Sequence, residues 1–296
     1  MTSFLKRICR NPKKFKISDA SDSDLNENKG KLPRTLILGL FLVLCWFLMA
    51  IFADFLVPYN PLEQNMDDLL QAPNLKHWLG TDEVGRDVLS RIIKGSQIDL
   101  SMGIIGVVLP FIIGNVIGLL SGYYGKWVDS IFMRILDITI SFPYFVLIIA
   151  IVSILGTGLS SFFISLALVG WVSYARIIRT QVLVIKGHEY IMASKSLAYS
   201  GKRIIFKHIL PNAILPSLVF AMTDVILVVL LGSSLGYLGL GVNPPTPEWG
   251  VMIKTGQTFY TQAWWLPTFP GIAILLFALS FSILADGFAD YWKVEV

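Results

Sequence analysis

The sequence predicts an all-helical integral membrane protein with six membrane-spanning helices. Of its 296 residues, 54% are hydrophobic and only 15% are charged, whereas soluble domains carry about 25% charged residues. Long uncharged runs also alternate with short polar segments. A run of about 20 apolar residues in a helix crosses the hydrocarbon core of a bilayer, and the chain holds enough such runs for six crossings.

A polar tail leads into the first apolar run. Residues 1–34 carry nine Lys or Arg residues and an acidic low-complexity stretch, so we expect a disordered cytoplasmic tail that is too polar to fold alone. The first predicted span covers 35–57 and opens with 19 uncharged residues. Pro58 and Pro61 end this helix, because proline has no backbone N–H to donate. A polar segment of mixed charge, 58–99, follows and is expected to be extracytoplasmic.

Three further spans follow. Residues 100–125 are uncharged throughout and predict the second span. The chain is again uncharged for 38 residues from position 138 to position 175, which is long enough for two spans. The sequence Gly-Thr-Gly at 156–158 is the break between them, because such clusters mark turns. The third and fourth spans are therefore predicted at 131–155 and 159–178.

A charged island at 176–212 then interrupts the apolar pattern. It holds seven Lys or Arg residues. Two short helices are predicted within it, at 189–199 and 202–210, which Gly201 divides and Pro211 closes. Neither helix is long enough to cross a membrane.

The first of these short helices has a narrow apolar face. Tyr190, Ala193 and Leu197 recur there at helical spacing. Such a face on a short helix is typical of a segment that docks into the groove of a partner. The alternative is a solvated basic loop whose positive charge only holds it in the cytoplasm.

The last third of the chain holds two more spans. Residues 213–237 predict the fifth span and 269–285 predict the sixth. The segment between them, 239–268, contains three prolines within four positions, which exclude a regular spanning helix there.

The distribution of basic residues predicts the orientation. Six spans place both ends of the chain on one side of the membrane. That side holds 19 of the 24 Lys and Arg residues, in the tail, the turn after the second span, the island and the C-terminal residues 291–296. Positively charged loops stay in the cytoplasm, so we expect both termini and the island to be cytoplasmic.

A compact motif lies in the polar segment before the second span, where residues 79–91 are LGTDEVGRDVLSR. Its spacing fits neither a nucleotide-binding loop nor a dinucleotide-binding fingerprint. An interface or structural role is therefore favoured over catalysis. The residues singled out in this motif are Leu79, Gly80, Thr81, Asp82, Gly85, Arg86, Asp87 and Ser90.

Three ionisable residues in the predicted spans are candidates for translocation or gating, because a charge inside a membrane is costly. Arg134 and Asp137 are three positions apart on one helix face and can pair, which favours a structural or gating role. Asp224 in the fifth span has no evident partner in the sequence, so it faces either the translocation path or a neighbouring helix. No series of carboxylates and histidines crosses the membrane, which argues against a proton-driven carrier.

The remaining patterns exclude several classes of site. The three histidines lie outside the predicted spans at no metal-ligand spacing, and the two cysteines fall in unlike environments, so neither a metal site nor a disulfide is predicted. No GxxxxGK[ST] loop occurs, so the chain is not expected to bind ATP in that way. Its net charge of +4 is divided between apolar runs and predicts no nucleic-acid partner. No catalytic residue is predicted.

The island resembles the loop that permease subunits of binding-protein-dependent ABC importers insert into their ATPase partners. That loop has Glu-Ala-Ala, three residues, Gly, nine residues, then a hydrophobic residue and Leu-Pro. The match is partial, because Met192 replaces the Glu, Ser194 the second Ala and Ala198 the Gly. The residues that the resemblance assigns to ATPase coupling are Glu189, Tyr190, Met192, Ala193, Ser194, Leu197, Ala198, His208, Leu210 and Pro211.

Two other motifs extend this resemblance over residues 35–290. The motif at 79–91 is similar to the extracytoplasmic element that follows the first span in peptide-type permeases, and it is intact here. The sequence Pro-Pro-Thr-Pro-Glu-Trp-Gly at 244–250 is similar to the same group of permeases.

The resemblance implies a fold, partners and a location. The fold is that of type I ABC importer permeases, in which a five-helix core, here 100–290, follows an extra first span. The coupling loop would cover 179–212. The implied partners are a second homologous permease subunit in a heterodimer, one or two ABC ATPase subunits that bind ATP and Mg, and an extracytoplasmic substrate-binding protein. The location would be the bacterial inner membrane, and this chain itself would carry no cofactor.

The same resemblance implies ATP-driven import by alternating access. Similar permeases serve oligopeptides, dipeptides, glutathione or nickel chelates, and a peptide is the expected substrate. Two other classes stay open. An ATP-independent channel or secondary carrier explains six spans but gives the short docking helices no purpose. A membrane-embedded enzyme would use the carboxylates at 82–87, for which no nucleophile, base or metal set is evident.

Overall fold

The computed structural model describes residues 32–292. The predictions for most of the tail and for the last four residues lie outside the described residues. Within 32–292 every regular element is helical, and extended backbone pairs only in an isolated bridge between Thr81 and Asp87. The predicted all-helical class is confirmed.

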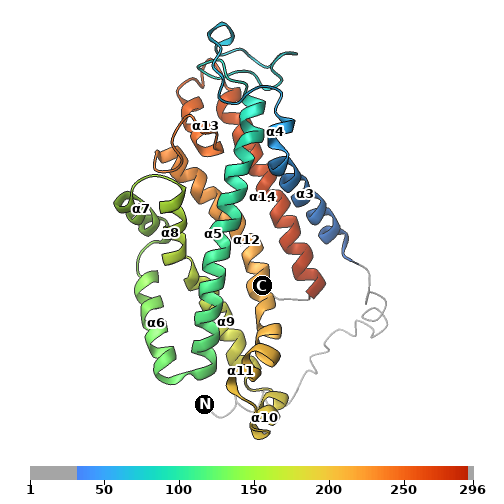
Figure 1. Cartoon of the computed structure of the whole chain (residues 1–296), viewed down its shortest axis with the longest axis vertical. Helices are drawn as coiled ribbons and strands as arrows, with labels where there is room; N and C mark the ends of the chain where they lie inside the picture. The colour runs from blue at the N-terminus through green and yellow to red at the C-terminus, as the bar shows by residue number, and fades with distance from the viewer. Residues whose placement is uncertain (1–31, 293–296) are drawn as a thin grey trace, which may run out of the picture. The chain divides into compact units, whose positions relative to one another are not determined.

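The elements carry the labels of Figure 1. In chain order they are α3 (Arg34–Ile51), α4 (Ala53–Leu56), η1 (Met66–Asp68), α5 (Val88–Tyr124), α6 (Lys126–Ile140), α7 (Tyr144–Leu155), α8 (Leu159–Val169), α9 (Trp171–Ile185), α10 (Glu189–Ser196), α11 (Gly201–Ile204), the π-helical turn η2 (Ile205–Ile209), α12 (Leu210–Leu238), α13 (Trp249–Gln257) and α14 (Trp265–Trp292).

Five helical stretches of the described chain are long and apolar enough to cross a membrane. They are Arg34–Ile51, Val88–Tyr124, Leu159–Ile185, Gly201–Leu238 and Trp265–Trp292. The helices α6 and α7 make a sixth candidate together, but the chain bends by 88° between them. The prediction of one regular span at 131–155 is therefore wrong. Within this range the helix breaks at Pro143, because proline has no backbone N–H to continue the helical hydrogen bonds. Pro143 lies in the uncharged run 138–175, so hydropathy gave no sign of the break.

The second span begins much earlier than hydropathy predicts. Asp87 caps the first turn of α5, because its side chain accepts a hydrogen bond of 2.8 Å from the Ser90 backbone N–H. Residues 88–99, which the sequence assigned to the polar segment, are therefore helical. As a result Asp99, which the sequence placed outside the spans, is fully buried within α5.

Glycines bring α5 and α9 into close contact. Gly114, Gly118 and Gly122 recur every four residues on α5. A Cβ atom at Gly114 would lie 2.3 Å from the Trp171 carbonyl oxygen, and one at Gly118 would lie 2.3 Å from that of Ala175. Only glycine permits this approach, which is the small-residue packing common between membrane helices.

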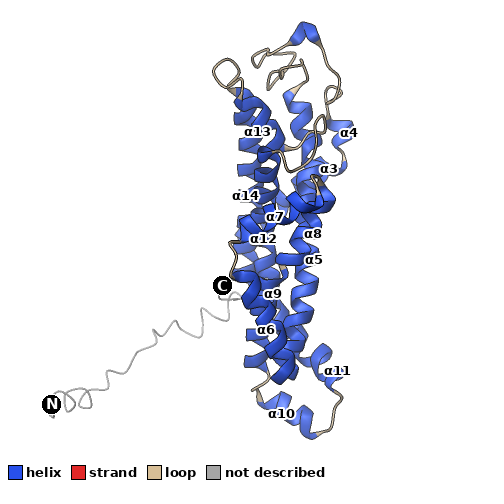
Figure 2. Cartoon of the chain, turned by 90° about the vertical axis from the view of Figure 1, so that its left-hand side faces the viewer, coloured by secondary structure: helices blue, strands red, loops and turns tan. Residues whose placement is uncertain are grey.

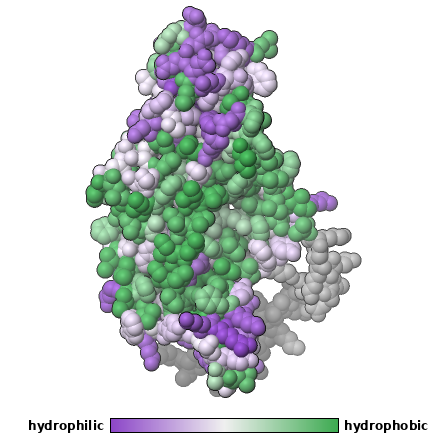
Figure 3. Space-filling view, viewed as in Figure 1, coloured by the Kyte–Doolittle hydropathy of each residue, from purple (hydrophilic) through white to green (hydrophobic). Residues whose placement is uncertain are grey.

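The helices of residues 34–292 enclose a shared core and leave polar segments at two opposite ends. Helix α3 packs on α14, and α12 packs on both α5 and α14 (Figure 1). The loop at 57–87, here called the polar cap, lies at one end beside α13, and α10 and α11 lie at the other (Figure 2). A hydrophobic belt separates these polar ends, as expected for a chain that crosses a membrane (Figure 3).

The second short helix of the island is not a separate element. Helix α11, turn η2 and helix α12 form one stretch, Gly201–Leu238. Pro211 lies in the first turn of α12, so the prediction that it closes a helix is wrong. A π-helical turn, η2, lies just before this proline, which has no backbone N–H to donate.

Candidate coupling and translocation sites

Helix α10 is held on the molecule by one buried face. Ile191 is fully buried and packs in a cluster with Ile178, Val182 and Ile204. Ser194 is also buried and donates a hydrogen bond of 2.8 Å to the Tyr190 carbonyl oxygen. These contacts fix the short helix, which is far too short to be stable alone.

A second face of α10 is exposed, and on it the Tyr190 ring stacks on the nearby His188 ring, with ring centres 5.7 Å apart. Tyr190, Met192 and Leu197 are 45%, 51% and 67% exposed. Ala193 and Glu189 are exposed as well. The predicted face of Tyr190, Ala193 and Leu197 is thus presented outward on an anchored helix, which is the arrangement that a docking helix requires.

Ala198 ends this helix in an unusual backbone conformation. Its φ is 56°, in the left-handed region that favours glycine. Around it, the Tyr199 N–H donates to the Ser194 carbonyl oxygen at 3.2 Å, and the Ala198 N–H donates to that of Lys195 at 2.9 Å. This pair of bonds is a Schellman motif, whose left-handed position is most often glycine. The position therefore explains why glycine suits this point of the loop.

The rest of the island packs against its own aromatic residues. His208 stacks on Tyr199 with an interplanar angle of 9°, and the Arg203 guanidinium lies 4.2 Å from the centre of the same ring. Leu210 is half-buried against the cluster around Ile191, whereas Pro211 is exposed. Of the predicted coupling residues, His208 and Leu210 therefore support the loop from within, and the exposed residues of α10 are free to contact a partner.

Two cations tie the base of the island to the turn between α5 and α6. Arg179 makes a two-pronged ion pair with Asp129, with distances of 2.5 Å from Nε to Oδ1 and 2.6 Å from Nη2 to Oδ2. Ser121 also donates to Asp129. The Lys186 Nζ atom donates to the Tyr123 carbonyl oxygen at 2.6 Å. A two-pronged pair fixes orientation as well as distance. These contacts therefore hold the base of the island in one orientation relative to the turn between α5 and α6.

The ion pair predicted between Arg134 and Asp137 does not form. Both side chains are exposed on α6, and no ion pair of the described chain joins them. The carboxylate of α6 that does pair is Asp129, and its partner lies 50 residues away. Helical spacing cannot identify such a partner.

Asp82 organises the motif of the polar cap. Its Oδ1 atom accepts backbone N–H groups of Val84 and Arg86, and its Oδ2 atom pairs with the Arg86 side chain at 2.6 Å. Gly85 has a φ of +77°, and a Cβ atom there would lie 1.8 Å from the Asn65 carbonyl oxygen. The close backbone approach explains why this position needs glycine.

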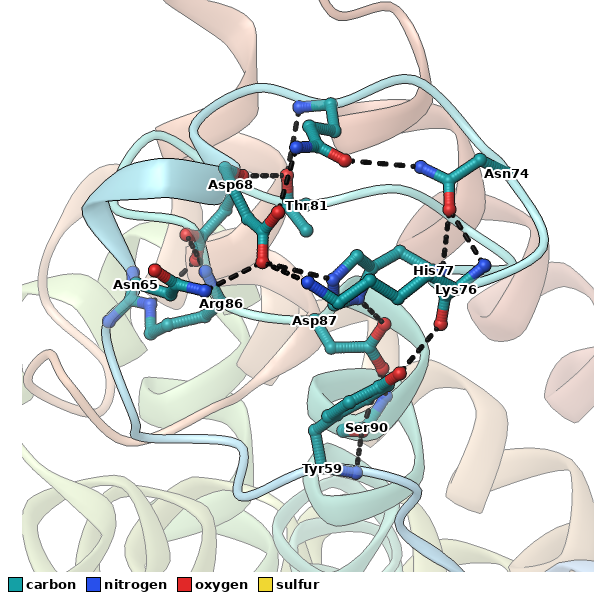
Figure 4. A network of polar contacts seen from close by, with 12 residues as sticks. Tyr59, Asn65, Asp68, Asn74, Lys76, His77, Thr81, Arg86, Asp87 and Ser90 are labelled. Atoms are coloured by element: carbon teal, nitrogen blue, oxygen red, sulfur yellow. Dashed lines mark hydrogen bonds and ion pairs between the residues drawn. The ribbon is translucent and has the colours of Figure 1, made fainter.

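Asp87 and His77 join the cap to the start of α5 (Figure 4). The Asp87 side chain accepts Ser90 Oγ at 2.7 Å and lies 2.9 Å from His77 Nδ1. Thr81 donates to the Asp68 carbonyl oxygen at 2.5 Å and accepts the Gln71 N–H at 2.8 Å. The motif residues Thr81, Asp82, Arg86, Asp87 and Ser90 are all buried, so the structure uses them to hold the cap together.

Lys76 stabilises the charged form of Asp68 in this cap. The two side chains lie 2.6 Å apart, and the hydrogen bond from Lys76 holds the pKa of the Asp68 carboxyl below its ordinary value. The same bond raises the pKa of Lys76. The sequence assigned neither residue to a site, because both lie outside the recognised motif.

Asp224 lies beside a small cavity between helices. Its Oδ2 atom accepts a hydrogen bond of 2.7 Å from the hydroxyl of Tyr174, a fully buried residue of α9. Tyr144, Ser173 and Phe220 line the same cavity, whose volume is about 150 Å³. The sequence left open whether Asp224 faces a path or a helix, and the structure shows both a helix partner and a space beside it.

The sequence did not predict a junction that holds two buried carboxyls, Asp99 and Glu248. Asp99 of α5 lies 3.4 Å from Ser233 Oγ and 3.3 Å from the Trp249 N–H. Glu248 accepts the Gly250 and Val251 N–H groups at 2.7 and 2.8 Å and so caps α13. Burial raises the pKa of the Glu248 carboxyl. In the sequence, only the motif Pro-Glu-Trp-Gly indicates that this region is structured. No local pattern links it to Asp99, which lies about 150 residues earlier.

Two family models match this chain and together cover most of it. Residues 114–293 match the family model of the binding-protein-dependent transport system inner membrane component. Residues 34–73 match the N-terminal transmembrane domain of oligopeptide transport permease C.

Proteins with similar sequences align with most of the chain. A dipeptide transport system permease protein DppC of Alkalihalophilus pseudofirmus is 40% identical over 88% of this chain and 86% of its own length. A glutathione transport system permease protein GsiD of Pectobacterium atrosepticum is 38% identical over 85% of this chain and 84% of its own. An inward-facing structure of the MetNI methionine ABC transporter covers 69% of this chain and 96% of its own with a TM-score of 0.55, at 20% identity, and supports the fold.

The spanning helices and the two polar ends define an integral membrane protein, and the matched family is a class of membrane permeases. The chain belongs to the family of binding-protein-dependent transport system inner membrane components. It is a transport subunit of an ABC importer, in which a separate subunit hydrolyses ATP, and no finding supports a secondary carrier or channel.

Proposed function

We propose that this chain is one of two homologous permease subunits in an ATP-driven importer of peptides. The expectation of peptides is supported by the relatives, which are named for dipeptides and glutathione, itself a peptide. The alternative substrates of similar permeases, such as nickel chelates, are outcomes of the experiment below.

Helix α10 is the surface on which an ATPase subunit would dock. The observation that carries this proposal is its division into a buried face at Ile191 and an exposed apolar face at Tyr190 and Leu197. A force applied to the exposed face would pass to α9 and α5 through the cluster around Ile191, and from α9 to α6 through the Arg179–Asp129 pair. The two ends of the membrane bundle would then switch between outward-open and inward-open states.

The polar cap is the surface that would meet the substrate-binding protein. Its buried polar network gives it a fixed shape, and the tip residues Leu75 and Trp78 are 98% and 70% exposed. This assignment places the cap outside the cell, and both termini and α10 in the cytoplasm, as the distribution of Lys and Arg predicts. Arg134 and Asp137 stay predictions for gating.

Purification from the native membrane tests this function. The chain would be isolated in mild detergent after crosslinking through a cysteine placed at Leu197, and the attached proteins identified by mass spectrometry. A second permease subunit and one or two ABC ATPases are expected, with the crosslink on an ATPase. A cysteine at Thr258, next to α13, is the control and should yield no ATPase crosslink. Recovery of the chain alone or as a homo-oligomer would refute the proposal.

The substrate is tested on the reconstituted complex. Binding protein loaded with a labelled dipeptide should drive ATP-dependent uptake into proteoliposomes. Uptake of a nickel chelate in place of peptides would leave the importer function intact and refute the peptide assignment.

A further inference from the structure

The cavity beside Asp224 lies at the junction of three membrane segments. Ser173 comes from α9, Phe220 and Asp224 come from the middle of α12, and Tyr144 is the first residue of α7. The 88° bend between α6 and α7 is what brings the start of α7 here. An interrupted helix beside a central cavity is a common way for transport proteins to place a substrate site.

Asp224 is a carboxylate that faces this cavity without a cation. Tyr174 donates to Oδ2, which leaves Oδ1 without a protein donor among the described residues. No Lys, Arg or His of residues 32–292 lies within ion-pair distance of it. An acidic group inside a membrane that lacks a charge partner is expected to serve a polar or charged ligand.

Tyr174 holds Asp224 in a fixed orientation. Its ring packs edge-on against Phe111 and Phe220, with interplanar angles of 82° and 74°. Because these contacts fix the phenol, the hydroxyl fixes the carboxylate in turn. The other carboxylate oxygen, Oδ1, is then available for a ligand.

The walls of the cavity suit a small cation. A water molecule occupies about 30 Å³ of liquid, so a cavity of about 150 Å³ accepts an ammonium group together with the carbon that carries it. The rings of Tyr144 and Phe220 line the space, and aromatic faces attract cations. A carboxylate or phosphate in the same place would be repelled by Asp224.

We infer that Asp224 binds an ammonium group of the transported peptide in this cavity during translocation. The inference rests on the proposed peptide function. The group is either the α-ammonium at the peptide N-terminus or the side-chain ammonium of a lysine. The competing explanation is that Asp224 and Tyr174 only join α9 to α12.

Uptake by the complete transporter in proteoliposomes tests the inference. The substrates are a dipeptide, its desamino analogue and an N-acetylated dipeptide that contains lysine, each bound to saturation by the binding protein. The wild-type chain is expected to import the dipeptide faster than the desamino analogue. Asp224→Asn should reduce dipeptide import by about tenfold or more, since hydrogen bonds to charged groups carry effects of that order, and should abolish the preference. Asp224→Glu should keep the preference.

A purely structural role predicts the opposite order. Asparagine has nearly the shape of aspartate and still accepts the Tyr174 hydrogen bond, so Asp224→Asn would then import normally while the longer Asp224→Glu would fail. That outcome overturns the inference. Asp290→Asn removes an exposed carboxylate of α14 and is the matched control. Faster import of the acetylated lysine peptide than of the desamino analogue would assign the side-chain ammonium, and equal slow import of both would assign the α-ammonium.

A second measurement does not depend on transport or on the Asp224 variants. Ser173→Cys, in a chain whose Cys9 and Cys45 are serine, places a thiol at an exposed position of the cavity. A cationic methanethiosulfonate should react with it several-fold faster than an anionic one of similar size. Equal rates would overturn the inference even if the permease function stood. Absence of uptake by the wild-type complex would instead refute the proposed function, so the two failures are distinguishable.

Discussion

The backbone N–H of Tyr199 donates to the carbonyl oxygen of Ser194 across 3.2 Å and so closes the end of α10 around Ala198. The closure forces Ala198 to a φ of 56°. Alanine in this region suffers a clash of its Cβ atom that glycine avoids. Helix α10 therefore ends on a strained residue.

Ala198→Gly should stabilise the end of α10. Removal of the Cβ strain favours the variant by about 1 kcal/mol, less the larger entropy of glycine in the unfolded chain. Hydrogen exchange of the Leu197 and Tyr199 amides should slow accordingly in the purified chain. Ala193→Gly is the control, because glycine inside a helix costs about 1 kcal/mol and should speed exchange. Faster exchange in Ala198→Gly would show that the left-handed turn is not strained.

Arg179→Lys should weaken the link between the island and the α5–α6 turn. Lysine keeps the charge but cannot reproduce both hydrogen bonds to Asp129. We expect a loss of about 1 kcal/mol in stability, since the pair is partly exposed. Thermal unfolding of the purified chain measures it. Arg134→Lys changes an exposed, unpaired cation on α6 and should leave the melting temperature unchanged, so equal shifts in the two variants would contradict the prediction.

Gly118→Ala should push α5 and α9 apart. The added Cβ atom would lie 2.3 Å from the Ala175 carbonyl oxygen, a distance that real Cβ atoms do not reach. Overpacking of this kind costs about 1–3 kcal/mol. A lower melting temperature in detergent is the expected result. Gly271→Ala, at a position in α14 where a Cβ atom meets nothing within 4 Å, is the control and should melt at or slightly above the wild-type temperature, because alanine favours a helix interior.

The polar cap should lose order at low pH through Asp68. Its pKa is lowered in the folded chain by the Lys76 hydrogen bond, so the folded state releases this proton more readily than the unfolded state. The contribution to stability is full above the ordinary value of 3.8 and disappears as the pH falls through the lower folded pKa. The protection of residues 65–81 against hydrogen exchange, relative to the intrinsic exchange rate at each pH, should fall over that window. Lys76→Met should show a smaller fall in protection, and an identical response in both chains would exclude this pair as the cause.

Hydropathy predicted most of the spans because a membrane leaves a helix few other solutions. It did not predict the α6–α7 bend, since Pro143 sits in a run that is uncharged on both sides. It also missed the early start of α5, because the first turns of that helix carry polar residues that the cap buries. An uninterrupted apolar run thus shows that a segment enters the membrane, but not that it crosses as one rod.

Some contacts of the candidate sites could likewise be predicted from the sequence, and others could not. The exposed face of α10 could be predicted, because Tyr190 and Leu197 follow a local helical period. The Asp129–Arg179 and Asp99–Trp249 contacts could not, since their partners are 50 and 150 residues apart and only tertiary packing joins them. The i, i+3 rule instead selected Arg134 and Asp137, which do not pair.

Ala193→Asp should uncouple ATP hydrolysis from uptake. Ala193 lies on the exposed face of α10 between Tyr190 and Leu197, so an aspartate there would bury an unpaired charge in the proposed ATPase groove. An uncompensated buried charge costs about 3–5 kcal/mol, which exceeds a typical coupling energy of about 1–3 kcal/mol. Uptake driven by loaded binding protein should therefore fall by at least tenfold in proteoliposomes, while the isolated ATPases hydrolyse ATP normally. Ser200→Asp adds the same charge to the same loop at the N-cap of α11, where aspartate caps as well as serine, and should transport normally. Normal uptake by a well-assembled Ala193→Asp complex would show that this face of α10 does not dock.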